Sequence, residues 1–171
     1  MKSIFTALAL VGGLLVSPVA VRAQTASSAA SFVIGGEVTQ RLVVNLAKLK
    51  TFPAASADVT YFAGGAVTTH SFTGALLWDV LQKAGIVVDS AVKNDILRKT
   101  VTVYGSDGYV SVFSAGEINP YFGGNQIILA YSQDGAPLGD GGIAKLVAPG
   151  DKAGGRFVSN IARITVRDSG R

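Results

Sequence analysis

The stretch from Asp107 to Val166 decides how this chain folds, and it reads DGYVSVFSAGEINPYFGGNQIILAYSQDGAPLGDGGIAKLVAPGDKAGGRFVSNIARITV. Runs of β-branched and aromatic residues alternate in it with turn residues, which is the pattern of consecutive short strands. Aspartate precedes glycine at Asp107, Asp134 and Asp140, a pair typical of tight turns. The stretch therefore predicts a sheet-rich core that ends in a long strand from Phe157 to Val166.

A hairpin is predicted upstream of that stretch. The β-rich runs 58–63 and 66–72 are joined by Gly64 and Gly65 alone. A two-residue glycine link between such runs is a strong hairpin signal, because glycine adopts the positive φ angles that these turns need. His70 alternates in phase with its neighbours in the second run, so we interpret it as an ordinary sheet histidine.

The main helix is predicted to follow this hairpin directly, over residues 74–85. Leu76, Leu77, Val80 and Leu81 recur at helical spacing and give the segment one apolar face. Gly85 stands where the C-terminus of a helix favours glycine.

Two further sites predict single helical turns. Asn45 can cap a turn that runs to residue 49, and Ser114 with Glu117 has the spacing of a capping box. Strands thus predominate, with one main helix, and we expect a single, mostly β domain of the α+β class over residues 32–171.

The first 23 residues have the pattern of a signal peptide. Lys2 supplies a positive charge, an apolar run follows over residues 4–16, and small residues precede a cleavage position between Ala23 and Gln24. The apolar run is shorter than the roughly 20 residues of a membrane-spanning helix. The sequence therefore predicts a periplasmic or secreted protein, with no membrane span after cleavage.

The predicted mature chain has 148 of the 171 residues and begins with a flexible, small-residue linker over residues 24–31. Loss of Lys2 and Arg22 lowers the formal net charge from +4 to +2. The remaining basic residues form no long run, so nothing indicates a nucleic-acid partner. Cysteine is absent, which excludes disulfides and thiolate metal sites, and His70 is the single histidine.

Three ordered blocks resemble the sulfite-oxidase-like molybdopterin-binding domain of oxidoreductases. The blocks are FTGALLWDVLQKAG at 72–85, DGY with its continuation to residue 138, and KLVAPG at 145–150 with GR and the strand to residue 166. The resemblance implies that fold, and a molybdopterin cofactor as the ligand of the family. Carried over position by position, it implies cofactor-binding roles for Tyr109, Lys145 and Arg156.

The chain also departs from the family pattern in ways that bear on chemistry. It lacks the cysteine that holds molybdenum, Asp140-Gly141-Gly142 replaces a His-Gly pair, and Ser159 replaces a lysine. We therefore assign no catalytic residue and no metal ligand, and we expect an exported, non-catalytic or accessory binding module for a small anionic or pterin-like ligand. The alternatives are a degenerate oxidoreductase acting on a small oxoanion and a structural envelope protein that binds a protein partner.

Overall fold

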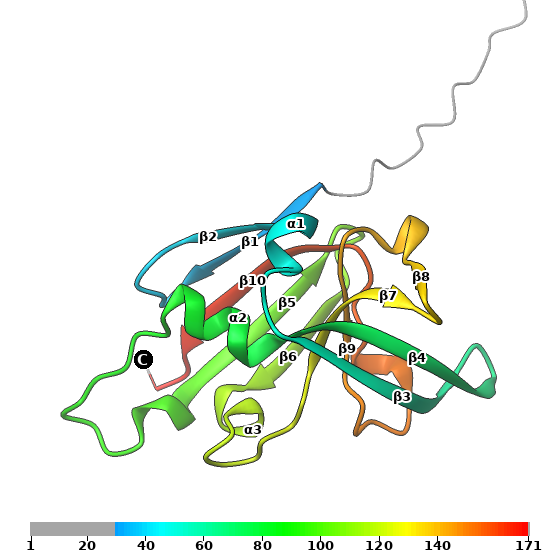
Figure 1. The fold of residues 1–171 in the computed structure, drawn as a ribbon. Helices are drawn as coiled ribbons and strands as arrows, with labels where there is room; N and C mark the ends of the chain where they lie inside the picture. Colours follow the sequence, from blue (N-terminus) through cyan, green and yellow to red (C-terminus); the bar gives the residue numbers. More distant parts are fainter. Residues whose placement is uncertain (1–29, 171) are drawn as a thin grey trace, which may run out of the picture.

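The computed structural model describes residues 30–170, which form two five-stranded β-sheets around one core (Figure 1). The predicted signal peptide and linker residues 24–29 lie outside the described residues, and Ser31, the last residue of the predicted linker, opens the first strand. Sheet 1 has the order β2-β1-β10-β5-β6. Its strands are β1 (Ser31–Gly36), β2 (Leu42–Asn45), β5 (Lys99–Gly105), β6 (Val110–Ser114) and β10 (Ile161–Asp168).

Sheet 2 has the order β3-β4-β7-β8, and β9 also pairs with β7. Its strands are β3 (Ala54–Ala63), β4 (Ala66–Leu76), β7 (Ile128–Gln133), β8 (Ala136–Pro137) and β9 (Lys145–Val147). The predicted hairpin is confirmed: Ala63 pairs with Ala66, and Gly64 and Gly65 have φ angles of 58° and 86°.

The helices are short. They are α1 (Leu46–Leu49), α2 (Leu77–Ala84) and α3 (Ala115–Ile118), with 3-10 turns η1 (Asp95–Arg98), η2 (Gly139–Gly141) and η3 (Gly154–Arg156). Both predicted caps are present. The Lys48 amide donates to Asn45 Oδ1 over 2.8 Å, and the Ser114 amide donates to Glu117 Oε2 over 3.2 Å.

The main helix begins three residues later than the sequence predicts. Strand β4 continues through Gly74 to Leu76 and pairs there with β7, so α2 begins at Leu77. A side chain at Gly74 would overlap the Leu129 backbone, so glycine permits this close approach of the two strands. The predicted C-terminus is confirmed, because Gly85 ends α2 with a φ of 73°.

The last strand begins later than predicted and changes phase at its start. Residues 157–160 precede β10, and a bulge separates Ile161 from Arg163 where β10 pairs with β5. Because of this bulge, Ile161 is buried together with Ile164 and Val166 instead of facing outward with Arg163. Because of the bulge, β10 contributes buried side chains to the core along most of its length.

The core lies between the inner faces of the two sheets, with α2 filling its side. Phe32 and Ile34 of β1, Phe72 of β4 and Leu81 of α2 are all completely buried. At about 1.5–3 kcal/mol for each large apolar side chain, such residues are the main source of stability. Within residues 30–170, no helix has both the length and the apolar character that a membrane crossing requires.

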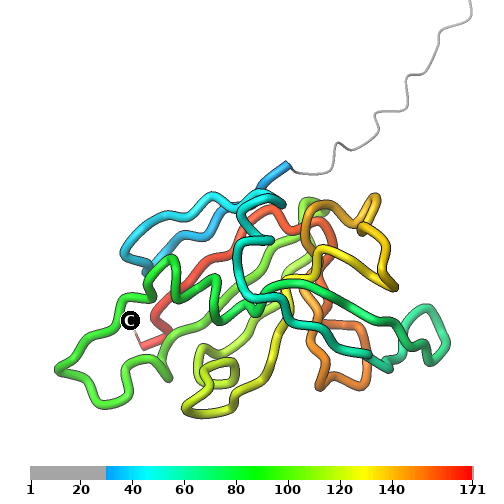
Figure 2. Tube along the Cα trace, in the orientation of Figure 1, coloured from blue at the N-terminus to red at the C-terminus, as the bar shows by residue number. Residues whose placement is uncertain are grey.

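The first and last strands lie side by side in the middle of sheet 1. Strand β1 pairs in parallel with β10, from Val33 opposite Arg163 to Gly36 opposite Val166. Figure 2 shows this as the blue and red segments running together through the molecule. The sheet therefore joins the two ends of the described chain.

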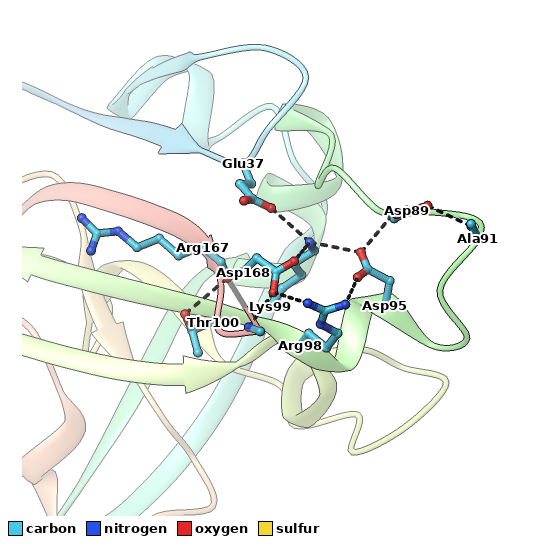
Figure 3. A network of polar contacts seen from close by, with 10 residues as sticks. Glu37, Asp89, Ala91, Asp95, Arg98, Lys99, Thr100, Arg167 and Asp168 are labelled. Carbon is cyan, nitrogen blue, oxygen red and sulfur yellow. Dashed lines mark hydrogen bonds and ion pairs between the residues drawn. The ribbon is translucent and has the colours of Figure 1, made fainter.

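A buried cation closes the end of this sheet (Figure 3). Lys99 Nζ lies 3.0 Å from Glu37 Oε2, 3.1 Å from Asp95 Oδ2 and 3.0 Å from Asp168 Oδ2. Burial alone would lower the pKa of Lys99, but its hydrogen bonds to Asp168, Glu37 and Asp95 raise the pKa well above the usual value. Arg98 flanks Asp95 and Asp168 at 3.6 and 3.4 Å. We call these five residues the Lys99 cluster.

Candidate functional site

A polar cavity of about 320 Å³ opens between two loops at the end of sheet 2. One loop precedes β7 and the other joins β9 to η3. Its lining residues are Asn125, Gln126, Ile127, Ala148, Pro149, Gly150, Asp151 and Arg156. The volume is at the lower end of the range for small-molecule sites, roughly 300–1,000 Å³.

Arg156 is the one predicted site residue in the cavity wall, and two carboxylates hold its guanidinium group. Nε and Nη2 donate to the two oxygens of Asp151 over 2.8 and 2.6 Å, while Nη1 donates to Glu117 Oε1 over 2.8 Å. The guanidinium carbon also lies 4.6 Å from the centre of the Phe113 ring. Planar two-point pairing and ring stacking both suit arginine and fix its orientation.

The charges of this group of residues sum to −1, because one cation faces two carboxylates. The two hydrogen bonds to Asp151, and also the one to Glu117, raise the pKa of Arg156 against the opposing effect of burial. The guanidinium stays charged, but its charge is already matched within the protein. An incoming anion would therefore meet net negative charge, so the cavity does not have the electrostatics of an oxoanion or phosphate site.

Tyr109 supports the Arg156 loop from outside the cavity. Its hydroxyl donates to the Gly155 carbonyl over 2.6 Å, and its backbone amide donates to Asp107 Oδ1 over 2.9 Å. The structure thus brings Tyr109 and Arg156 to neighbouring positions, although Tyr109 is not part of the cavity lining. In this arrangement Tyr109 holds the loop that carries the guanidinium group.

Lys145, the third predicted site residue, belongs to a different cluster. It lies at the start of β9 opposite Ala130 of β7, and its Nζ is 5.4 Å from the centre of the Phe72 ring. Burial lowers the pKa of Lys145. Phe72 in turn packs edge-on against Phe157, and Lys145 is not part of the cavity lining.

The single histidine is fixed in the same aromatic region. His70 Nδ1 lies 2.7 Å from Asp134 Oδ2, and His70 Nε2 lies 3.1 Å from the Thr68 hydroxyl. The Ser71 amide donates to Asp134 Oδ1, and together with His70 it lowers the pKa of Asp134. The contacts agree with the interpretation of His70 as a sheet histidine, and Asp134 sits in a tight turn at a φ of 53°.

The sequence did not reveal the two carboxylate partners of Arg156, which are Asp151 in the cavity lining and Glu117 beside it. Glu117 was interpreted only as the capping residue of α3, and its Oε2 does accept from the Ser114 amide. Its other oxygen binds Arg156, which lies 39 residues away in the sequence. The capping-box spacing could reveal the first role, but nothing in the local sequence could reveal the second.

A molybdenum cofactor does not fit the residues present. The chain has no cysteine, so it cannot supply the thiolate ligand of the enzymes it resembles. Across the part of the chain that the structure describes, no three His, Cys, Asp or Glu side chains are arranged to hold a metal ion. The matched charge of Arg156 adds a third mismatch, because a phosphate group would lack an unpaired cation there.

Comparisons with known proteins identify the fold and the family of this chain. The sulfane dehydrogenase SoxCD from Paracoccus pantotrophus is similar in structure, with a TM-score of 0.65 over 81% of this chain. The two sequences are 21% identical, so the likeness shows the fold, and this chain spans 38% of the length of that one. No curated protein matches the sequence. The family model described as "oxidoreductase molybdopterin binding domain" matches residues 19–171, nearly the whole chain. This chain therefore belongs to the oxidoreductase molybdopterin binding domain family.

Proposed function

We propose that this chain is an exported binding module that performs no redox chemistry of its own. Its ligand is a small polar heterocycle, uncharged or cationic, held in the cavity beside Arg156. A pterin without phosphate or metal has this chemistry. The observation that carries the proposal is the pairing of Arg156 with both Asp151 and Glu117 in the wall of a ligand-sized cavity.

The lining chemistry supports a heterocycle over an oxoanion. Asn125 and Gln126 offer amide groups, which both donate and accept hydrogen bonds, as the edge of a pterin ring requires. The carboxylates of Asp151 and Glu117 add acceptors with negative charge. An oxoanion presents acceptors only, so it would be repelled by these carboxylates.

Calorimetric titration of the mature chain with biopterin and with molybdate tests this ligand class. We expect biopterin to bind and molybdate to give no heat of binding. Gln126→Ala should weaken biopterin binding about tenfold, as expected for the loss of a polar contact worth about 1.4 kcal/mol. Gln82→Ala, which changes an exposed glutamine on α2, is the matched control and should bind like the wild type.

A second experiment distinguishes a binding module from a degenerate oxidoreductase. Metal analysis by mass spectrometry and pterin fluorescence are measured on chain purified from its native source. Absence of molybdenum is the expected result. Stoichiometric molybdenum with pterin, together with turnover of a small oxoanion, would reject the proposal.

Export is a separate part of the proposal and rests on the leader-like residues 1–23. We expect N-terminal sequencing of the protein from its native host to begin at Gln24, and cell fractionation to recover it from the periplasm or the medium. A cytoplasmic protein that retains Lys2 would contradict export without affecting the ligand.

A further inference from the structure

We propose that the outward side of sheet 1 is a docking surface for an acidic partner protein. We call this side the outer face. It consists of the odd-numbered residues of β1, β2 and of β10 from Arg163 onward, and the even-numbered residues of β5 and β6. Strand registry fixes this assignment, because Val43, Val33, Arg163, Tyr104 and Val110 are successive partners across the five strands.

The outer face is uncovered, in contrast to the inner face. Val43, Val110 and Val112 are 48%, 47% and 52% exposed, whereas Phe32 and Phe113, which point inward from the same sheet, are at most 1% exposed. These valines lie at the two edges of the sheet, Val43 on β2 and Val110 with Val112 on β6, and they flank Arg163 and Tyr104. Exposed apolar side chains on one open sheet face, together with a stacked arginine, favour an interaction site.

The only charged residues of the outer face are positive. None of its residues is aspartate or glutamate, and it carries Arg163 and Arg167. The Arg163 guanidinium lies 3.9 Å from the centre of the Tyr104 ring. Arg167 points away from the Lys99 cluster in Figure 3. Across residues 30–170, neither arginine forms an ion pair, in contrast to Arg156.

These features favour an acidic protein over the other occupants. A second copy stacked face to face would bring arginines together with no carboxylate between them, which costs binding energy. Membrane-binding surfaces use protruding aromatic groups and amphipathic helices, and this face has neither. Its short β-branched side chains lose little conformational freedom on contact, and a stacked arginine-tyrosine pair is typical of the centre of protein interfaces.

The geometry also specifies the partner. Arg163 and Arg167 are four residues apart in one strand, so their carboxylate partners should lie about 13 Å apart. Five strands at about 4.8 Å spacing give the face an area of roughly 500 Å². Burying it would remove about 1,000 Å² in total from solvent, the lower limit for specific complexes, so we expect a transient complex.

The test uses the intact mature chain and three probes: a random copolymer of glutamate and tyrosine, the corresponding copolymer of lysine and tyrosine, and phosphatidylglycerol vesicles. Calorimetry measures affinity and amide chemical shifts locate the contact. We expect the acidic copolymer alone to bind, with shifts confined to the five strands of the outer face. R163E/R167E should weaken binding at least about tenfold, since it replaces two attractive charges with repulsive ones.

Two further variants keep the result specific. K93E/K152E makes the same change in net charge at exposed lysines outside the outer face and should bind nearly as well as the wild type. Val112→Glu adds a carboxylate at an exposed edge position without removing the arginine-tyrosine contact, and should weaken binding in a folded protein.

Four results would overturn the proposal. The acidic copolymer fails to bind, or it shifts amides mainly outside the five strands of sheet 1. Both double variants lose affinity equally, which would indicate net charge alone. Vesicles bind in place of the copolymer, which would indicate a membrane surface. Sedimentation reveals a dimer that Val112→Glu dissociates, which would indicate a second copy.

Discussion

Lys99 and Arg156 are both cations that hold several carboxylates, yet their surroundings make them different kinds of site. Lys99 has a side chain that is 2% exposed and contacts Glu37, Asp95 and Asp168. Arg156 has a side chain that is 38% exposed and contacts two carboxylates at the wall of the cavity. Similar ion pairs are therefore found in two settings in this fold, one buried in the interior and one partly exposed beside a cavity.

The degree of burial decides how much free energy is lost when such an ion pair is broken. A buried charge that loses its partners cannot recover its solvation from water, so the Lys99 cluster resists change and fixes the strand ends. A half-exposed charge exchanges its partners for water at small cost. Removing the partners of Arg156 should therefore cost much less than removing those of Lys99.

The largest difference should appear when the two cations are removed. Lys99→Met keeps the side-chain volume but leaves two buried carboxylates, Asp95 and Asp168, without this cation. We expect a loss of about 3–5 kcal/mol in the free energy of unfolding. Urea unfolding followed by circular dichroism measures it. Lys93→Met, at an exposed lysine, should change the free energy by no more than about 0.5 kcal/mol. Equal free energies of unfolding for the two variants would contradict the prediction that a buried lysine contributes more to stability than an exposed one.

Acid titration should sharpen the comparison further. The hydrogen bond from Lys99 lowers the pKa of Asp168, and the Asp89 amide, followed by Lys99, lowers that of Asp95. A carboxyl with a lowered folded pKa contributes stability above its unfolded pKa, near 3.9, and loses it as pH falls through the folded pKa. The cluster should therefore be insensitive between about pH 5 and 9 and weaken below about pH 4.

Asp168→Asn isolates that titration from the other acids of the chain. The variant should be less stable than the wild type at neutral pH, and the difference between them should shrink as the pH falls below about 4. Thermal melts across this range measure the difference. A difference that stays constant down to the lowest pH would contradict the lowered pKa of Asp168.

Arg156→Met should have a smaller effect that depends on salt. Its ion pairs are partly exposed and screened, so we expect a loss of about 1 kcal/mol at low ionic strength. In 1 M salt the Debye length falls to about 3 Å, so the loss should diminish, whereas that of Lys99→Met should persist. Urea unfolding at two salt concentrations makes the comparison. A salt effect on Lys99→Met as large as that on Arg156→Met would contradict the role of burial.

Lys145 offers the smallest expected effect. Burial lowers its pKa, so the folded state binds this proton less tightly than the unfolded state does. Stability should therefore rise with pH between the folded and unfolded pKa values of Lys145. Lys145→Met should remove that rise, which melts between pH 8 and about 10.4 can detect. An unchanged rise would show that it comes from another group.

Local signals in the sequence identified the turns and caps of this fold but not every element boundary. Gly64-Gly65, Asn45 and the Ser114–Glu117 pair act within a few residues, and all three appear as predicted. The start of α2 could not be predicted, because pairing of β4 with β7 extends the strand past Gly74 into a helix-like pattern of leucines. Tertiary pairing overrode the local preference there.

The side-chain contacts of the Lys99 cluster and of the candidate site were harder to predict from the sequence, for the same reason. A lysine in an alternating strand usually points to water, so Lys99 looked ordinary, and two of its partners are 62 and 69 residues away. The family resemblance predicted one shared site for three residues, and two of them, Tyr109 and Arg156, do lie close together. The contact of Lys145 with Phe72 depends on how β9 pairs within sheet 2. The matched charge of Arg156 required the folded positions of Glu117 and Asp151.

The parallel pairing of β1 with β10 also sets the order in which the protein can fold. Strand β1 cannot complete sheet 1 until residues 161–168 are available, because β10 separates it from β5. Contacts of such long sequence separation slow folding, since the loop must close before they form. Sheet 1 should therefore remain incomplete until almost all of the chain has been synthesised. Any truncation that removes β10 should also separate β1 and β2 from the rest of sheet 1.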